Sequence, residues 1–142
     1  MTVTFCGHGD LSYSNDIKKI LYEVLEKLIK EGANEFLLGG YGSFDMLAAH
    51  TINDLKKKYP DIRSVFVMPY LNRNYDTALY DETIYPDIEH IPKRLAIIKR
   101  NEYMADAADV VVAYVYHDWG GATKMLKYAK KRVKRVINIP EL

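Results

Sequence analysis

Cysteine is nearly absent from this sequence, and so are long apolar runs. The single cysteine, Cys6, has no partner for an internal disulfide, and no Cys/His spacing typical of a metal site occurs. No apolar run approaches the roughly 20 residues that cross a bilayer, and the first residues, MTVTFCGHGD, lack the basic and apolar regions of a signal peptide. We therefore expect a cytoplasmic protein with no metal, no bound cofactor and no membrane partner.

An excess of either charge is also missing. Lys and Arg total 20 and Asp and Glu total 19, which leaves a formal net charge of +1. No global field therefore favours a polyanionic partner, and nucleic acid is not expected as one, although a local cluster of cations could still attract it. One basic stretch near the end is interpreted as a solvated helix face, and it contains Lys124, Lys127, Lys130, Lys131, Arg132, Lys134 and Arg135.

What the sequence does contain is a regular alternation of strand and helix patterns. Its 142 residues, 49% of them hydrophobic, fit a single domain over residues 1–142. Strands are predicted at 3–6, 35–38, 63–68, 110–116 and 135–139, with helices at about 15–31, 44–58, 94–107 and 124–131. In the third helix, Leu95, Ile98, Met104 and Ala105 are expected to face inward, and residues 70–93 are expected to form a long polar loop. Such alternation predicts an α/β, single Rossmann-like three-layer domain with a mostly parallel sheet of about five strands.

Glycine-rich turns follow three of these strands. They are Gly7-His8-Gly9, Gly39-Gly40-Tyr41-Gly42-Ser43 and Gly120-Gly121-Ala122-Thr123. In a parallel sheet all three lie at the carboxyl edge, where helix N-termini present unpaired N–H groups to anions. Neither the Walker phosphate loop nor the dinucleotide pattern G-x-G-x-x-G is present, so ATP hydrolysis and NAD-dependent hydride transfer are poorly supported.

Several side chains near these turns are candidates for ligand contacts. Asp45 would lie in the first turn of the second helix, facing either ribose hydroxyls or the helix's own N–H groups. Arg100-Asn101 could reach the same edge and pair with phosphate, or Arg100 could be a plain surface residue. His8 and Asp10 could hold the ligand or serve acid–base chemistry, although a loop histidine is more often merely solvated. Asp81, Glu82, Asp87 and Glu89 show no catalytic spacing.

The assembled motifs resemble those of the SLOG superfamily, which joins the Smf (DprA) DNA-processing proteins to the Lonely Guy enzymes. The resemblance covers nearly the whole chain and depends on the three glycine turns, on Arg100-Asn101-x-x-Met104 and on Ala108-Asp109-Val110. It is nearest to small DUF1273-type members. It implies a Rossmann-like fold, a homodimer or higher oligomer, and binding of nucleotides, nucleotide sugars or NAD- and ADP-ribose-derived molecules.

The resemblance fails at the residues that carry hydrolysis in the phosphoribohydrolase branch. That branch has P-G-G-x-G-T-x-x-E, whereas here Trp119 replaces the proline and the glycine before the threonine is missing. The residues after Thr123 are Lys124, Met125, Leu126 and Lys127, so no glutamate occupies that turn. Arg100 matches the family arginine, but the catalytic residues stay unassigned. We therefore expect a sensor or sequestering protein for a nucleotide-derived small molecule.

In this hypothesis the N–H groups of residues 40–43 and 121–123 hold phosphate, Asp45 binds a ribose hydroxyl and Trp119 stacks on the base. The expected ligand-binding residues are Gly7, His8, Gly9, Asp10, Gly39, Gly40, Tyr41, Gly42, Ser43, Asp45, Arg100, Asn101, Trp119, Gly120, Gly121, Ala122 and Thr123. Two alternatives stay open. One is an N-glycoside hydrolase or deoxyribosyltransferase-like enzyme that takes its carboxylate from Asp10, Glu82 or Glu102, and the other is nucleic-acid binding through the basic helix.

Overall fold

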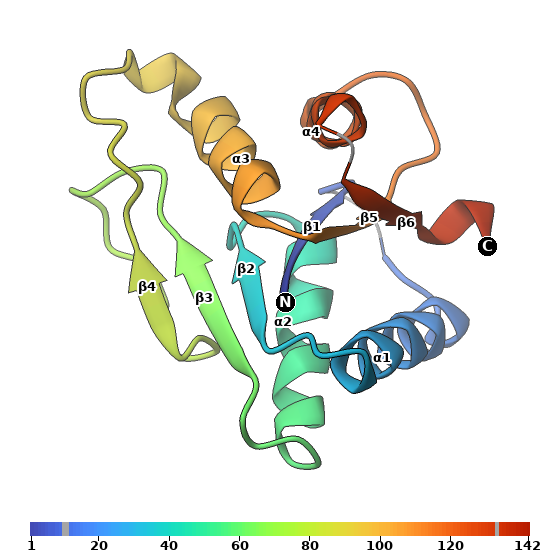
Figure 1. The fold of residues 1–142 in the computed structure, drawn as a ribbon. Helices are drawn as coiled ribbons and strands as arrows, with labels where there is room; N and C mark the ends of the chain where they lie inside the picture. Colours follow the sequence, from blue (N-terminus) through green and yellow to red (C-terminus); the bar gives the residue numbers. More distant parts are fainter. Residues whose placement is uncertain (10–11, 133) are drawn as a thin grey trace.

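The computed structural model describes residues 1–9, 12–132 and 134–142 as an alternation of strands and helices (Figure 1). Asp10, Leu11 and Val133 lie outside the described residues. The elements in chain order are β1 (Thr2–Gly7), α1 (Asn15–Lys30), β2 (Glu35–Leu38), α2 (Ser43–Lys56), β3 (Arg63–Val67), β4 (Glu82–Ile84), the 3-10 turn η1 (Lys93–Leu95), α3 (Ala96–Ala107), β5 (Val110–Tyr114), α4 (Gly121–Lys131), β6 (Arg135–Asn138) and the 3-10 turn η2 (Ile139–Glu141).

The strands form one parallel sheet in the order β4-β3-β2-β1-β5-β6. β1 lies at its centre, with Val3 opposite both Phe36 of β2 and Val110 of β5. The expected α/β fold with parallel pairing is confirmed. The strand count differs, because the sheet has six strands where about five were expected.

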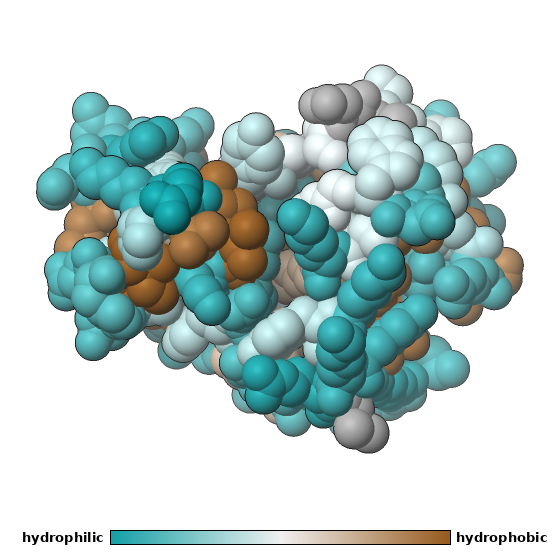
Figure 2. Space-filling model, turned by 90° about the horizontal axis from the view of Figure 1, so that it is seen from above, coloured by the Kyte–Doolittle hydropathy of each residue, from teal (hydrophilic) through white to brown (hydrophobic). Residues whose placement is uncertain are grey.

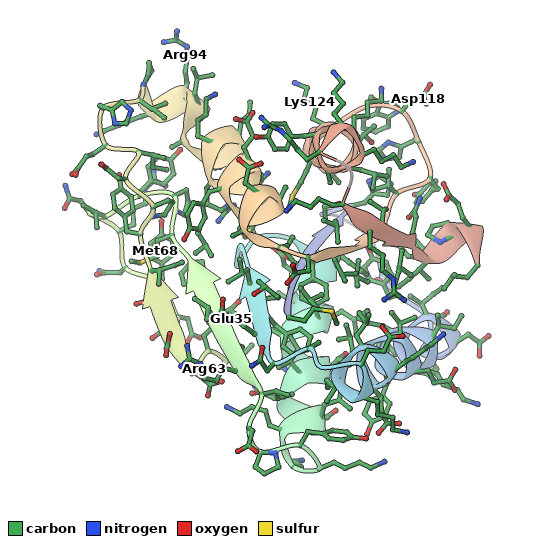
Figure 3. The ribbon with its side chains drawn as sticks, in the orientation of Figure 1. Glu35, Arg63, Met68, Arg94, Asp118 and Lys124 are labelled. Carbon is green, nitrogen blue, oxygen red and sulfur yellow. The ribbon has the colours of Figure 1, made fainter. Side chains whose placement is uncertain are left out.

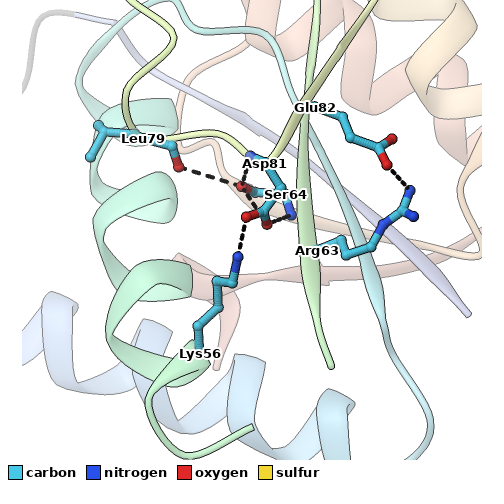
Figure 4. Close-up of polar contacts among 6 residues, drawn as sticks. All are labelled: Lys56, Arg63, Ser64, Leu79, Asp81 and Glu82. Atoms are coloured by element: carbon cyan, nitrogen blue, oxygen red, sulfur yellow. Dashed lines mark hydrogen bonds and ion pairs between the residues drawn. The ribbon is translucent and has the colours of Figure 1, made fainter. Parts of the chain in front are cut away.

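The additional strand, β4, lies inside the stretch that was expected to be a loop. Its three residues are mostly exposed and carry no apolar alternation, so the sequence offers little strand signal. Asp81, just before β4, accepts hydrogen bonds from the N–H of Ser64 (2.8 Å) and from Lys56, while its own N–H donates to the Ser64 carbonyl (3.0 Å) (Figure 4). Arg63 also pairs with Glu82 at 2.7 Å (Figure 4). Long-range polar contacts therefore hold β4 at this edge.

Two helices cover each face of the sheet, and each layer has its own core (Figure 1). Leu21, Leu25 and Phe44 from α1 and α2 pack with Val3 and Phe5 of β1. On the opposite face Met104 of α3 and Met125 of α4 pack with Cys6 and Val111. This alternation along β1 and β5 is what strands buried on both faces require. The three-layer arrangement agrees with the expectation.

The helix ends differ from the sequence expectation in small ways. The hydroxyl of Ser14 caps α1 by accepting the N–H of Ile17 at 3.3 Å. α2 already begins at Ser43 and α4 at Gly121, directly after their glycines. In α3 the expected inward position of Ile98 is wrong, because its side chain is 39% exposed. No helix in the described ranges is long and apolar enough to cross a membrane.

Candidate functional site

A cavity of about 600 Å³ opens at the carboxyl edge of the sheet, where β1 and β5 end and α2, α3 and α4 meet. Figure 3 helps to locate this edge, since Asp118 and Lys124 lie beside it, whereas Glu35 and Arg63 lie at the amino edge. Eleven of the expected site residues line the cavity: Gly7, His8, Gly9, Tyr41, Asp45, Arg100, Asn101, Trp119, Gly120, Gly121 and Ala122. Other lining residues were not expected, namely Phe5, Cys6, Ile97, Met104, Tyr116, His117 and Met125.

The turn before α2 is closed by the protein's own backbone. Gly42 has φ +92°, and a Cβ at this position would lie 2.8 Å from the Cα of Gly9, so only glycine permits the two loops to cross here. The N–H of Ser43 donates to the carbonyl of Gly9 at 2.9 Å, and the N–H of Tyr41 donates to Asp45 at 3.4 Å. Gly39, Gly40, Gly42 and Ser43 do not line the cavity. The amides of Tyr41 and Ser43, which were expected to hold phosphate, are therefore engaged within the protein.

The N-terminus of α4 is open by contrast. Gly120 precedes the helix with φ +97° and provides no side-chain cap, and a Cβ on Gly121 would meet no atom within 4 Å. No residue in the described ranges accepts a hydrogen bond from the N–H of Gly121 or Ala122. The first N–H groups of a helix have no intrahelical acceptor and carry a partial positive charge. This turn therefore offers free anion donors to the cavity.

Thr123 has a structural role at the same turn. Its hydroxyl bonds to the carbonyls of His117 at 2.8 Å and Trp119 at 3.0 Å. The side chain is buried and does not line the cavity. Thr123 thereby holds the loop that follows β5 against the start of α4, and only its backbone remains a candidate for ligand contact.

Three stacked rings form one wall of the cavity. The ring of His117 lies 3.6 Å from that of His8 and 3.9 Å from that of Trp119, and both pairs are nearly parallel. Tyr116 meets His8 edge-on at 4.6 Å. Trp119 is 71% exposed, and Tyr41 and Tyr116 are exposed as well. The cavity mouth is therefore rimmed by aromatic rings, to which a planar group can stack.

His8 occupies the inner end of this stack. It is 8% exposed, and its Nε2 accepts the N–H of Tyr116 at 3.2 Å. Burial lowers the pKa of His8, and the adjacent His117 lowers it further. Both effects favour the neutral ring. Because Nε2 accepts a hydrogen bond, the proton of the neutral ring is assigned to Nδ1. His8 is thus a packed residue of the wall, in contrast to the solvated loop histidine that sequence statistics favoured.

Arg100 lines the cavity but is buried, which contradicts the second of its two sequence interpretations, a plain surface residue. Its side chain is only 3% exposed, and Nη1 donates to the carbonyls of Gly39 (2.8 Å) and Val67 (2.9 Å). Nε donates to the side chain of Asn101 at 3.0 Å. Burial lowers the pKa of Arg100, while the charge of Asp45 acts against that shift. Arg100 therefore joins α3 to the ends of β2 and β3 and is not a plain surface arginine.

Asp45 lines the cavity and lies near the buried Arg100. Burial raises the pKa of Asp45 to about 6, although Arg100 and the backbone N–H groups of Tyr41 and Gly39 lower it. The hydrogen bond from Tyr41 connects Asp45 to the turn that precedes α2. Among the described lining residues Asp45 alone carries a carboxylate.

The other proposed carboxylates lie elsewhere. Glu82 pairs with Arg63 at the start of β4, and Glu102 pairs with Lys99 at 3.2 Å on α3; neither lines the cavity. Asp10 lies outside the described residues. Within the described part of the chain, no group of three His, Cys, Asp or Glu residues is arranged to hold a metal ion.

A larger but shallower groove of about 900 Å³ lies between α1 and α2. Its lining mixes cations and anions, including Lys18, Lys19, Glu23 and Glu26, and contains no glycine turn. Ligands of open parallel sheets bind outside the carboxyl ends of the strands. We therefore assign the site to the smaller cavity.

Solved structures with the same fold include two DNA-processing proteins. DNA processing protein A from Helicobacter pylori, studied for its single-stranded DNA binding mode, aligns with a TM-score of 0.64 and 18% identity over 96% of this chain and 63% of its own. DNA processing protein A from Streptococcus pneumoniae aligns with a TM-score of 0.66 and 16% identity over 95% of this chain and 48% of its own. The protein TM1055 aligns at 0.65 and 17% identity, covering 95% and 71%. At these identities the likeness shows the Rossmann-like fold alone.

Sequence comparison gives the family. The chain is 26% identical over 138 residues to the uncharacterized SPbeta prophage-derived protein YoqJ of Bacillus subtilis, covering 81% of each chain. It is 28% identical over 139 residues to a UPF0398 protein of Halalkalibacterium halodurans, covering 89% of this chain and 72% of the relative. The family model for the YspA SLOG family matches residues 10–138. The expected SLOG membership is thereby confirmed, and this chain belongs to the YspA SLOG family.

Proposed function

We propose that this protein binds a nucleotide-derived small molecule in the cavity at the carboxyl edge, as a sensor or sequestering protein. The observation that carries the proposal is the pairing of two features across one cavity: free N–H groups at the start of α4 and a stack of aromatic rings whose outermost member, Trp119, is exposed. The first feature suits a phosphate and the second suits a base. A volume of about 600 Å³ lies within the usual range for ligand pockets.

We assign the phosphate contact to one turn, where the sequence suggested two. The amides of Tyr41 and Ser43 are bonded within the protein, so we assign the phosphate to Gly121 and Ala122. Asp45 lies at the cavity wall and can accept a hydrogen bond from a ribose hydroxyl. The positive charge of the nearby Arg100 favours the ionised form of Asp45.

A thermal-shift screen against nucleotides, nucleotide sugars, NAD and ADP-ribose tests the proposal. A ligand at a hundredfold over its Kd adds about 2.7 kcal/mol to the free energy of unfolding. The informative variant is Gly121→Asp, because the position has room for a side chain and an acid at a helix N-terminus favours the helix. Its carboxylate would repel phosphate, so we expect an unchanged or higher melting temperature without ligand and no shift with ligand.

Asn15→Asp is the matched control. It makes the same charge change at the first residue of α1, an exposed position outside the cavity. We expect this variant to keep the full ligand shift. A shift that survives in Gly121→Asp, or the absence of a shift with every compound, would overturn the proposal.

A second candidate function is binding of single-stranded nucleic acid through α4. The exposed cations Lys124, Lys127, Lys130 and Lys131 make no ion pair with any residue in the described ranges. The Helicobacter pylori structural neighbour was studied for such binding. Binding of an oligonucleotide that weakens steeply with salt would support this function, and no binding at low salt would dismiss it.

A further inference from the structure

A second hollow, of about 360 Å³, continues from the cavity along the outer side of α3 and α4. We name it the α3–α4 groove, and residues that define it are Ile97, Ile98, Asn101, Lys124, Lys127 and Tyr128. Ile97, Asn101, Gly121 and Met125 line both the groove and the cavity. The two hollows therefore adjoin at the open N-terminus of α4. Figure 2 shows this face hollowed in its middle, with hydrophobic residues on the left side of the hollow and hydrophilic residues on the right.

The groove combines an apolar floor with a cationic rim. Ile97 and Ile98 are partly exposed at 37% and 39%, although they belong to a helix with a buried face. Lys124, Lys127 and Lys131 line the α4 side, spaced so that they share one face of the helix. Figure 3 shows Lys124 extending from α4 away from the sheet.

The charges in the groove do not cancel. Glu102, the groove's acidic residue, is paired with Lys99. The three groove lysines make no ion pair with any residue that the structure describes. An anion that enters the groove therefore meets unpaired cations above apolar side chains.

From the shared lining of the two hollows and the unpaired cations of the groove, we infer that the natural ligand is a dinucleotide-type molecule whose two halves are joined by a pyrophosphate. This inference builds on the proposed function of the cavity. The first nucleoside lies in the cavity, the pyrophosphate crosses the start of α4, and the second nucleoside lies in the α3–α4 groove. Six residues of α-helix rise about 9 Å, so Lys127 lies within reach of a phosphate or ribose that continues past Gly121.

Isothermal titration calorimetry tests the inference with defined probes. AMP, GMP, CMP and UMP are each compared with the symmetrical dinucleotide built from the same nucleoside through a pyrophosphate. For the base that binds, we expect the dinucleotide to bind at least about tenfold more tightly than the monophosphate, which corresponds to one additional charge-assisted contact.

Two groove variants and one control complete the test. Lys127→Gln removes a cation from the rim of the groove, and Ile98→Asp places an anion on its floor. Each variant should therefore weaken binding of the dinucleotide more than binding of the monophosphate, which lowers the ratio of their affinities toward one. Lys130→Gln makes the same charge change on an exposed part of α4 outside the groove and should keep the ratio of the unaltered protein.

The two possible failures are distinguishable. Equal affinities for monophosphate and dinucleotide, or a ratio unchanged in both groove variants, would overturn the inference and leave the proposed function standing. No binding of any of these compounds, together with no shift in the nucleotide screen, would overturn both.

Discussion

Asp45 should make the stability of this protein fall as the pH rises from acid to neutral. Its pKa is raised by burial to about 6 in the folded protein, against an ordinary value of 3.8. Between these values the folded protein holds a proton that the unfolded chain has already released. The free energy of unfolding therefore decreases with increasing pH across this window.

The size of this effect follows from the shift. A difference of about two pKa units corresponds to about 3 kcal/mol, present below the unfolded pKa and lost by about pH 7. The contacts of Asp81 with Lys56 and Ser64 outweigh burial and lower its pKa. Its contribution to the free energy of unfolding therefore changes with pH in the opposite direction, rising as the pH rises. The effect of Asp45 must therefore be measured as a difference between two proteins.

Asp45→Asn is the appropriate comparison, because asparagine has nearly the same shape and does not titrate. Urea unfolding followed by circular dichroism at about pH 4 and about pH 7 gives the free energy of unfolding of both proteins. We expect the original protein to lose about 2.4 kcal/mol relative to the variant between these values, since the unfolded carboxyl is already partly ionised at pH 4. A difference between the two proteins that stays constant with pH would refute this account of Asp45.

Three further predictions concern stability. Arg100→Met removes the donor to two strand carbonyls and leaves Asp45 without its partner charge, so chemical denaturation should show a loss of about 3–5 kcal/mol. Gly40→Ala requires a side chain at φ +66°, 2.6 Å from an aromatic ring of β3, and should lower the melting temperature by several degrees, whereas Gly121→Ala should leave it unchanged. Asp81→Ala should speed hydrogen exchange of the β3 and β4 amides without affecting β1, and uniform protection would contradict the anchoring role of this residue.

Most of the fold could be predicted because the buried strands and the helices have strong local signals. The valines of β5 and the helical spacing of apolar residues in α1 define these elements without tertiary information. β4 could not be predicted, since three mostly exposed residues become a strand only through the contacts of Asp81 with β3. Ile98 was assigned inward from its apolar character, but it faces the groove between two helices.

The candidate site was predictable in position but not in detail. Glycine turns after parallel strands indicate the carboxyl edge by topology alone. Contacts between loops distant in sequence escape such reasoning, and these include the His8–His117 stack and the bond from Ser43 to Gly9. Tyr116 and His117 could have been found from their place just after the end of β5. β5 pairs with β1, and Tyr114 lies opposite Gly7, so the residues that follow β5 lie beside the first glycine turn.

Some expectations remain predictions. The single-domain boundary, the cytoplasmic location and the homodimer depend on information outside the fold itself. Multi-angle light scattering of the purified chain tests the dimer, with a mass near 16.4 kDa arguing against it.

The most direct test of the central claim is to map ligand-induced changes on the backbone amides by NMR. With a nucleotide selected by the thermal-shift screen at saturation, we expect shifts to concentrate in residues 7–9, 41–45 and 116–124, around the cavity at the carboxyl edge. Shifts confined to α1 and α2, along the larger groove lined by Lys18, Tyr22 and His50, would contradict the assignment of the site.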